Sequence, residues 1–145
     1  MRMKGNLIVL LIVAFAACNE QVKTENKSKE HANESAHVVR VIPLNNGGKW
    51  KADESTKNNV ASIRVLINDS AYATADKRDQ LVSHLQGKID TLISQCRMNG
   101  ADHDALHVWL ERVLTDTKEL KQDGEYSKKY AALKDDVESF HTYFE

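Results

Sequence analysis

Residues 89–114, "IDTLISQCRMNGADHDALHVWLERVL", contain the end of one amphipathic segment and the start of another. Before the break, apolar residues recur three or four positions apart, and the same spacing resumes after it. The break itself, Met98–Gly100, is only three residues long. Two apolar stripes joined by so short a connection indicate antiparallel helices packed against each other. This hairpin therefore predicts a helical bundle.

The chain around the hairpin extends the same pattern to four segments. Residues 50–145 contain no proline, and we expect helices over about 53–70, 75–97 and 126–144, with a third helix that opens after Gly100 and has Asp102 as its N-cap. Together they predict an all-α, up-down-up-down four-helix bundle with a single core. The predicted core-facing residues are Val60, Ile63, Leu66 and Ile67; Leu81, Val82, Leu85, Ile89, Leu92, Ile93 and Cys96; His103, Leu106, Leu110, Val113, Thr117 and Leu120; and Tyr130, Leu133, Val137, Phe140 or His141, and Phe144.

The N-terminus has the pattern of a targeting segment. Residues 1–17, "MRMKGNLIVLLIVAFAA", place two basic residues ahead of an apolar run that is too short to span a bilayer. The run ends in "FAAC", which resembles a bacterial lipobox with Cys18 as the lipidated first residue, although Phe15 stands where leucine is usual. We expect a lipid anchor in the membrane, with plain secretion or an uncleaved anchor as alternatives.

Residues 18–49 separate this signal peptide from the bundle. Residues 19–36 are rich in Lys, Glu, Asn and Ser and have no apolar pattern, which is typical of a solvated tether. The following "HVVRVIPLNNGG" combines β-branched residues with the only proline and a turn signal. We expect an extended arm along the domain that ends just before Trp50.

Charge and compartment exclude some functions. Cleavage after residue 17 would remove two of the 20 basic residues and none of the 21 acidic ones, leaving a formal charge of −3. A nucleic-acid-binding domain would show a basic face, so we expect no nucleic-acid partner. We also expect the protein to be a monomer. Asn19, in place of an aspartate that retains lipoproteins at the inner membrane, favours the outer membrane, facing the periplasm. Cys96 would then be the only unmodified thiol in an oxidising compartment.

The bundle topology brings several potential metal ligands to one end of the domain. Cys96 and Met98 end the second helix, His103 and His107 begin the third, and His141 lies near the end of the fourth. Two imidazoles at positions i and i+4 can bind one metal ion, and a thiolate and a thioether are soft donors. The predicted metal ion is therefore copper(I) or zinc.

Other interpretations of these residues remain open. Trp50 and Lys51 should close over the same end, whereas His84 belongs to the opposite end. The cysteine and histidines can instead be core or polar residues of a structural or partner-binding lipoprotein without metal. Non-covalent haem between a histidine and Met98 is a second alternative. The chain has no phosphate-binding loop, nucleophile elbow or "HExxH", so we do not expect an enzyme.

The segments "GGKWKADESTKNNVASI" and "CRMNGADHDALHVWL" resemble a group of small, uncharacterised exported proteins and lipoproteins of Bacteroidetes. Those proteins share a "KW" pair before the first helix and a hairpin of the form C-x-M-x-G-x-x-H-[DE]-x-L-H-x-[WF]-L. A proline that follows the last leucine in that group is replaced here by "ERV". The resemblance spans about residues 48–120 and implies the fold and the export, but no reaction. The matching residues are Trp50, Cys96, Met98, Gly100, His103, Asp104, Leu106, His107, Trp109 and Leu110.

Overall fold

The structure is a computed structural model and describes residues 41–145. Four long helices follow one another in this range: α1 (Glu54–Ile67), α2 (Arg78–Gln95), α3 (Gly100–Leu120) and α4 (Tyr126–Glu138). A single turn, α5 (Phe140–Tyr143), follows α4. The predicted signal peptide (1–17), the lipidation of Cys18 and the tether (19–36) lie outside the described residues.

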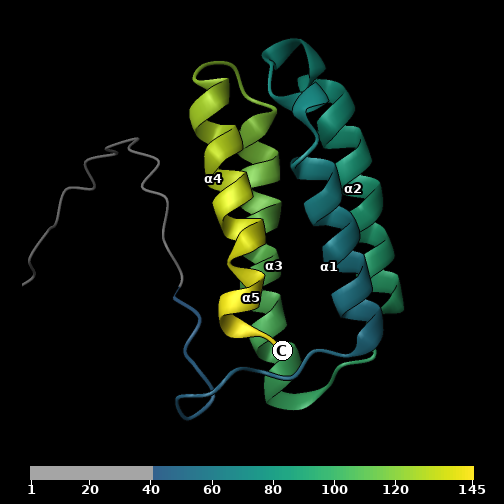
Figure 1. The fold of residues 1–145 in the computed structure, drawn as a ribbon, viewed down its shortest axis with the longest axis vertical. Helices are drawn as coiled ribbons and strands as arrows, with labels where there is room; N and C mark the ends of the chain where they lie inside the picture. The colour runs from purple at the N-terminus through teal and green to yellow at the C-terminus, as the bar shows by residue number, and fades with distance from the viewer. Residues whose placement is uncertain (1–40) are drawn as a thin grey trace, which may run out of the picture. The chain divides into compact units, whose positions relative to one another are not determined.

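The four long helices form the predicted bundle. In Figure 1, α1 lies beside α2 and α3 lies beside α4, with all four axes roughly antiparallel to their neighbours. Contacts of α1 with α4 and of α2 with α3 complete the ring. The prediction of an all-α fold is confirmed. Within residues 41–145, no helix combines the length and apolar character needed to cross a membrane.

Most of the predicted stripes face the core, because the periodic apolar residues of each helix meet those of its neighbours. Trp109 is completely buried; its ring packs edge-on against Phe140, with centroids 5.1 Å apart. Its indole Nε1 donates a hydrogen bond of 2.9 Å to the backbone oxygen of Asp136. The largest side chains that are almost fully buried are Trp109, Phe140, Phe144, Ile42, Ile63, Ile67, Leu81, Leu85, Ile89, Leu92, Leu120 and Leu133.

Ile93 is placed differently from the prediction, and the choice left open between Phe140 and His141 is decided. Ile93 is 52% exposed, because the seven-residue stripe on α2 is wider than the surface that the neighbouring helices cover. Phe140, rather than His141, occupies the core position on the last helical turn, and His141 is exposed. Cys96 and His103 are half-buried at the rim of the core.

Local hydrogen bonds shorten two of the predicted helices. The predicted helix over 53–70 ends at Ile67, and Asp69 then caps a 3₁₀ turn by accepting the N–H of Ala71 at 2.9 Å. The predicted helix over 126–144 is interrupted at Ser139, whose hydroxyl donates to the backbone oxygen of Asp136 at 2.7 Å. A serine that bonds to the preceding turn in this way competes with the regular helix.

The start of α3 corrects another prediction. The helix begins at Gly100, with Asn99 as the N-cap residue, so Asp102 is not its N-cap. Gly100 has φ +60°, a conformation that glycine adopts without steric cost. Asp102 instead lies in the first turn, and its Oδ1 accepts the backbone N–H of Lys51 at 2.9 Å.

Residues 41–52, which we call the strap, pack across the end of the bundle that holds the C-terminus (Figure 1). Ile42 is only 1% exposed and belongs to the core. Further along, Trp50 pairs in parallel with Phe144. The Trp50 N–H donates to the oxygen of Tyr143 at 2.8 Å, and the N–H of Glu145 donates to the oxygen of Trp50 at 3.0 Å. The strap, at the start of the described chain, is therefore hydrogen-bonded to the last residues of the chain.

Candidate metal centre

Three of the predicted ligands line one small cleft between α2 and α3. Cys96, at the C-terminal end of α2, lies opposite His103 and His107 in the first two turns of α3. The cleft has a volume of about 40 Å³. Apolar side chains complete its wall: Leu92, Ile93, Leu106 and Leu110. The topology thus brings together a thiol and two imidazoles, as the sequence predicts.

The two histidines of the cleft contact each other. Their ring centroids are 4.4 Å apart and the ring planes make an angle of 76°. This contact follows from the helix, because residues four positions apart lie one turn above another on the same face. His103 is half-buried and His107 is exposed, so the pair spans from the rim of the core to the solvent.

Cys96 is held at the point where α2 ends. Its backbone N–H still donates to the oxygen of Leu92 at 2.9 Å, but its own backbone is already extended. The side chain is half-buried and its thiol is free. Within residues 41–145, no three His, Cys, Asp or Glu side chains are grouped, as they stand, so that they could hold one metal ion.

Met98 does not share this cleft. It lines a separate hollow of about 260 Å³, together with Lys51, Asp53 and Asp102 among others. Cys96 and Met98 therefore line different hollows, although only Arg97 separates them in sequence.

His141 also lies elsewhere. Its Nε2 is 2.7 Å from Nη1 of Arg64, and its backbone oxygen accepts a hydrogen bond from Nζ of Lys49 at 2.6 Å. Since a guanidinium can only donate, the Nε2 lone pair of His141 is used in this contact. The structure therefore places His141 at the junction of the strap, α1 and α5, and not in the cleft with Cys96 and His103.

His84 is found at the other end of the bundle, as expected. Its Nδ1 lies 2.8 Å from the hydroxyl oxygen of Tyr72, which belongs to the α1–α2 connection. Tyr126 of α4 holds that same connection by donating its hydroxyl to the oxygen of Tyr72 at 2.6 Å. His84 is thus a suitable control for experiments on His103 and His107.

Comparison of the chain with protein families, with curated proteins and with solved structures finds no match. The resemblance to the exported Bacteroidetes proteins stays a prediction.

Asp53 is a residue at this end of the bundle whose role the sequence analysis did not identify. Its Oδ1 accepts the N–H of Thr56 at 2.6 Å and so caps α1, while its Oδ2 accepts the N–H of Arg97 at 2.7 Å. Partial burial alone raises the pKa of Asp53, but hydrogen bonds from Thr56, Arg97 and Ser55 outweigh that effect and lower it to about 2. An aspartate directly before the apolar periodicity of α1 indicates an N-cap. No sequence feature near Asp53 indicates its hydrogen bond to the distant Arg97.

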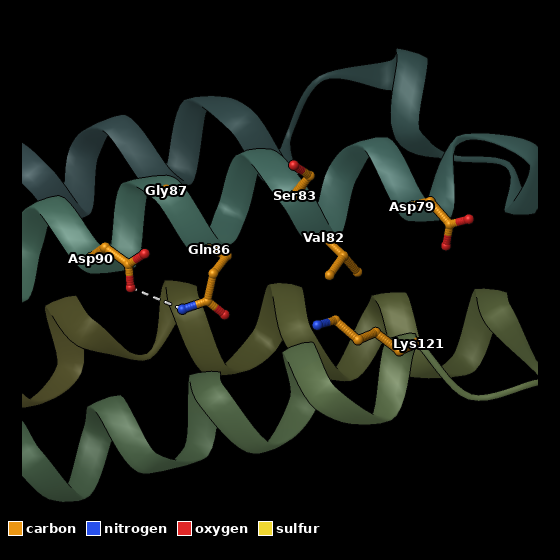
Figure 2. Close-up of a pocket in the computed structure, with 7 residues that line it drawn as sticks. All are labelled: Asp79, Val82, Ser83, Gln86, Gly87, Asp90 and Lys121. Atoms are coloured by element: carbon orange, nitrogen blue, oxygen red, sulfur yellow. Dashed lines mark hydrogen bonds between the residues drawn. The ribbon is translucent and has the colours of Figure 1, made fainter.

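A larger and more open hollow lies at the other end of the α2–α3 junction. It measures about 620 Å³ and is lined along α2 by Asp79, Val82, Ser83, Gln86, Gly87 and Asp90. Figure 2 shows Lys121 reaching into it from the end of α3, while Gln86 bonds to Asp90. The α2–α3 face is therefore hollowed at both ends, with the exposed Ile93 beside the smaller cleft.

Proposed function

We propose that this chain is a lipid-anchored protein of the bacterial envelope whose helical domain binds a soft metal ion, copper(I) or zinc, between α2 and α3. The observation that carries the proposal is that Cys96, His103 and His107 line the same cleft. The anchor rests on the lipobox-like sequence that ends at Cys18.

The chemistry of the donor set supports a soft metal. A thiolate and imidazole nitrogens are the ligands that copper(I) and zinc prefer, whereas magnesium and calcium require oxygen ligands. The side chains that line the cleft provide no carboxylate or other side-chain oxygen. Met98 and His141 are left out of the proposed ligand set, because the former lines another hollow and the latter contacts Arg64.

Binding requires rotation of side chains, because the three donors do not converge as they stand. His107 is exposed and can change its rotamer without disturbing the core. The half-buried Cys96 sits where α2 has ended. The proposed site therefore requires new rotamers of Cys96 and His107 before all three donors can bind one ion.

Thermal unfolding with and without metal tests the proposal. A ligand that binds only the folded state stabilises it by RT ln(1 + [L]/Kd), about 2.7 kcal/mol at a hundredfold excess over Kd. Under reducing conditions, His103→Ala and His107→Ala should abolish the stabilisation, and the matched His84→Ala should retain it. Equal melting temperatures with metal and with chelator would contradict the proposal.

A partner-binding lipoprotein without metal is the second candidate. The exposed Ile93 and the hollow beside Lys121 favour it, because both lie on the α2–α3 face. Side chains of a partner protein can anchor an interface by filling a hollow of this kind. The same metal titration separates the two candidates, because a partner-binding surface would not respond to copper(I) or zinc.

A further inference from the structure

From the exposed apolar side chains of the strap we infer that residues 41–50 contact the surface of the phospholipid bilayer in which the chain is anchored. The contact depends on the proposed lipid anchor at Cys18, which brings the bilayer within reach, so it rests on the proposed function. Figure 1 shows the strap, in blue, at the end of the bundle that holds the C-terminus. The folded domain would therefore face the membrane with this end.

Exposed large apolar side chains are concentrated on the strap. Within residues 41–145 there are four of them: Val41 and Leu44 on the strap, Val65 on α1 and Ile93 on α2. Val41 is 74% exposed and Leu44 is 46% exposed, and Pro43 between them is exposed as well. Single apolar residues on a surface are ordinary, whereas several in one short segment indicate a contact surface.

These side chains are held outside the core by a segment that is itself fixed to it. Ile42, next to Val41, is 1% exposed and belongs to the core. Asn45 and Gly48 exchange two backbone hydrogen bonds of 2.9 Å, which close a turn directly after Leu44. A contact made by side chains that are already held in place loses less conformational entropy than one made by a flexible segment.

Trp50 adds an amphipathic ring beside the exposed segment. Its indole Nε1 donates a hydrogen bond of 2.7 Å to the backbone oxygen of Pro43, so the ring lies next to the residues that separate Val41 from the turn. The side chain of Trp50 is only partly buried. Tryptophan is enriched at membrane–water interfaces, because its ring is apolar and its N–H is polar.

The charge of the strap is compatible with a surface of lipid phosphate groups. Residues 41–52 contain Lys49 and Lys51, both exposed, and no aspartate or glutamate. The next acidic residue, Asp53, accepts the backbone N–H groups of Thr56 and Arg97, so its carboxylate is directed toward the protein. Lysines beside an anionic lipid surface are attracted to it.

The position of the strap along the chain identifies the bilayer as its partner. The described domain begins at Val41, so the strap is the first part of it that the chain from Cys18 reaches. The 22 residues from 19 to 40 can span at most about 80 Å, whereas α3, with 21 residues, is about 30 Å long. The anchor alone therefore permits many orientations of the domain. Because docking of an anchored chain is intramolecular, an apolar contact too small to hold a free protein on a membrane can select one of them.

The experiment uses the full chain, purified from the bacterial envelope and reconstituted into vesicles of phosphatidylethanolamine and phosphatidylglycerol. Mass spectrometry first shows whether acyl chains are attached. Trp50 is the reporter, because the other tryptophan, Trp109, is completely buried in the core. Emission is compared between vesicles with ordinary acyl chains and vesicles with acyl chains brominated near the headgroup, which quench a tryptophan by contact. Trp50→Phe keeps the backbone pairing of the strap and supplies the signal of Trp109 alone.

We expect brominated lipid to quench Trp50 in the lipidated protein. The double variant Val41→Ser, Leu44→Ser should lose this quenching. Its matched control, Val65→Ser, Ile93→Ser, removes the two exposed apolar side chains that lie outside the strap and should retain it. All four side chains are exposed, so both double variants should keep the helical circular dichroism of the wild type.

The outcomes separate the membrane contact from the anchor. A lipidated protein whose Trp50 is not quenched would overturn the contact and leave the anchor standing. Equal loss of quenching in the two double variants would also overturn it, because the strap would then not be the surface in contact. A change in Trp50 emission that follows the protein density in the vesicles, without quenching by bromine, would show a second copy on the strap and overturn it too. A protein without acyl chains would contradict the proposed anchor itself, and the contact with it.

Discussion

Asp53 and Arg97 are 44 positions apart in sequence, yet Oδ2 of Asp53 accepts the backbone N–H of Arg97 at 2.7 Å. The other oxygen of the same carboxylate caps α1 through the N–H of Thr56. One side chain thus fixes the start of α1 to the connection between α2 and α3, directly beside Cys96. The position of the candidate cleft depends on this bridge.

Replacing Asp53 by alanine should destabilise the domain, chiefly at neutral pH. The loss of an N-cap and of a second hydrogen bond to a charged group costs about 2 kcal/mol in free energy of unfolding. The pKa of Asp53 is lowered from 3.8 to about 2 in the folded state. Its pH-dependent stabilisation is therefore complete above the unfolded pKa of 3.8 and is lost as the pH falls through about 2.

Urea unfolding of the wild type and of Asp53→Ala at several pH values measures this effect. The difference in free energy should be largest near neutral pH and should shrink toward pH 2. Asp104→Ala, which removes an exposed carboxylate from the same end of the domain, should change stability little. A difference between wild type and Asp53→Ala that is constant with pH would show that the charge of Asp53 does not contribute.

The strap should contribute to the core, whereas the tether that precedes it should not. Ile42→Ala removes a side chain that is 1% exposed and should cost about 2–4 kcal/mol in free energy of unfolding. Deleting residues 19–36, which have no apolar pattern, should shift the melting temperature little. Circular dichroism melts of both variants check this; a large loss of helix on deleting the tether would place it in the folded domain.

Two glycines should respond in opposite directions to substitution by alanine. Gly87 lies within α2, and a Cβ there would meet no atom within 4 Å, so Gly87→Ala should raise the free energy of unfolding by about 0.5–1 kcal/mol. Gly100 has φ +60°, so Gly100→Ala should lower it by about 1 kcal/mol. Chemical denaturation measures both; destabilisation by Gly87→Ala would show that the open space beside this residue is filled in solution.

The proposed lipid anchor predicts that replacing Cys18 changes membrane partitioning. Cys18→Ala should abolish incorporation of radiolabelled fatty acid and leave an uncleaved or soluble protein, because the apolar run before it is too short to span a bilayer. Detergent phase partitioning and labelling of wild type and variant provide the measurement. Fatty-acid labelling that persists in Cys18→Ala would rule out this cysteine as the site of attachment.

The apolar periodicity of the sequence was sufficient to predict the four long helices and most of the core. It did not determine how wide a surface each neighbouring helix covers, which is why Ile93 was predicted to be buried and is exposed. For the same reason it could not decide between Phe140 and His141, which are adjacent at the edge of the stripe. Which residue at the edge of a stripe is buried depends on how all the helices of the bundle pack together.

The candidate site was predicted in part. Helical spacing and topology were enough to bring Cys96, His103 and His107 to one cleft. The same reasoning located Met98 and His141 only to the correct end of the bundle. Which way a residue faces at the end of the bundle depends on long-range partners, such as Arg64 for His141. Asp102 was likewise predicted to cap α3, but the nearby N–H of Lys51 occupies its carboxylate.

The pairing of Trp50 with Phe144 determines where the folded domain receives a mechanical load. If the chain is pulled through the residues that precede the strap, tension reaches the buried Ile42 and then the hydrogen bonds between Trp50 and residues 143 and 145. Helix α1, which begins after the strap, is loaded only once these contacts yield. The contacts of the strap with residues 143–145 would thus bear such a load before α1 does.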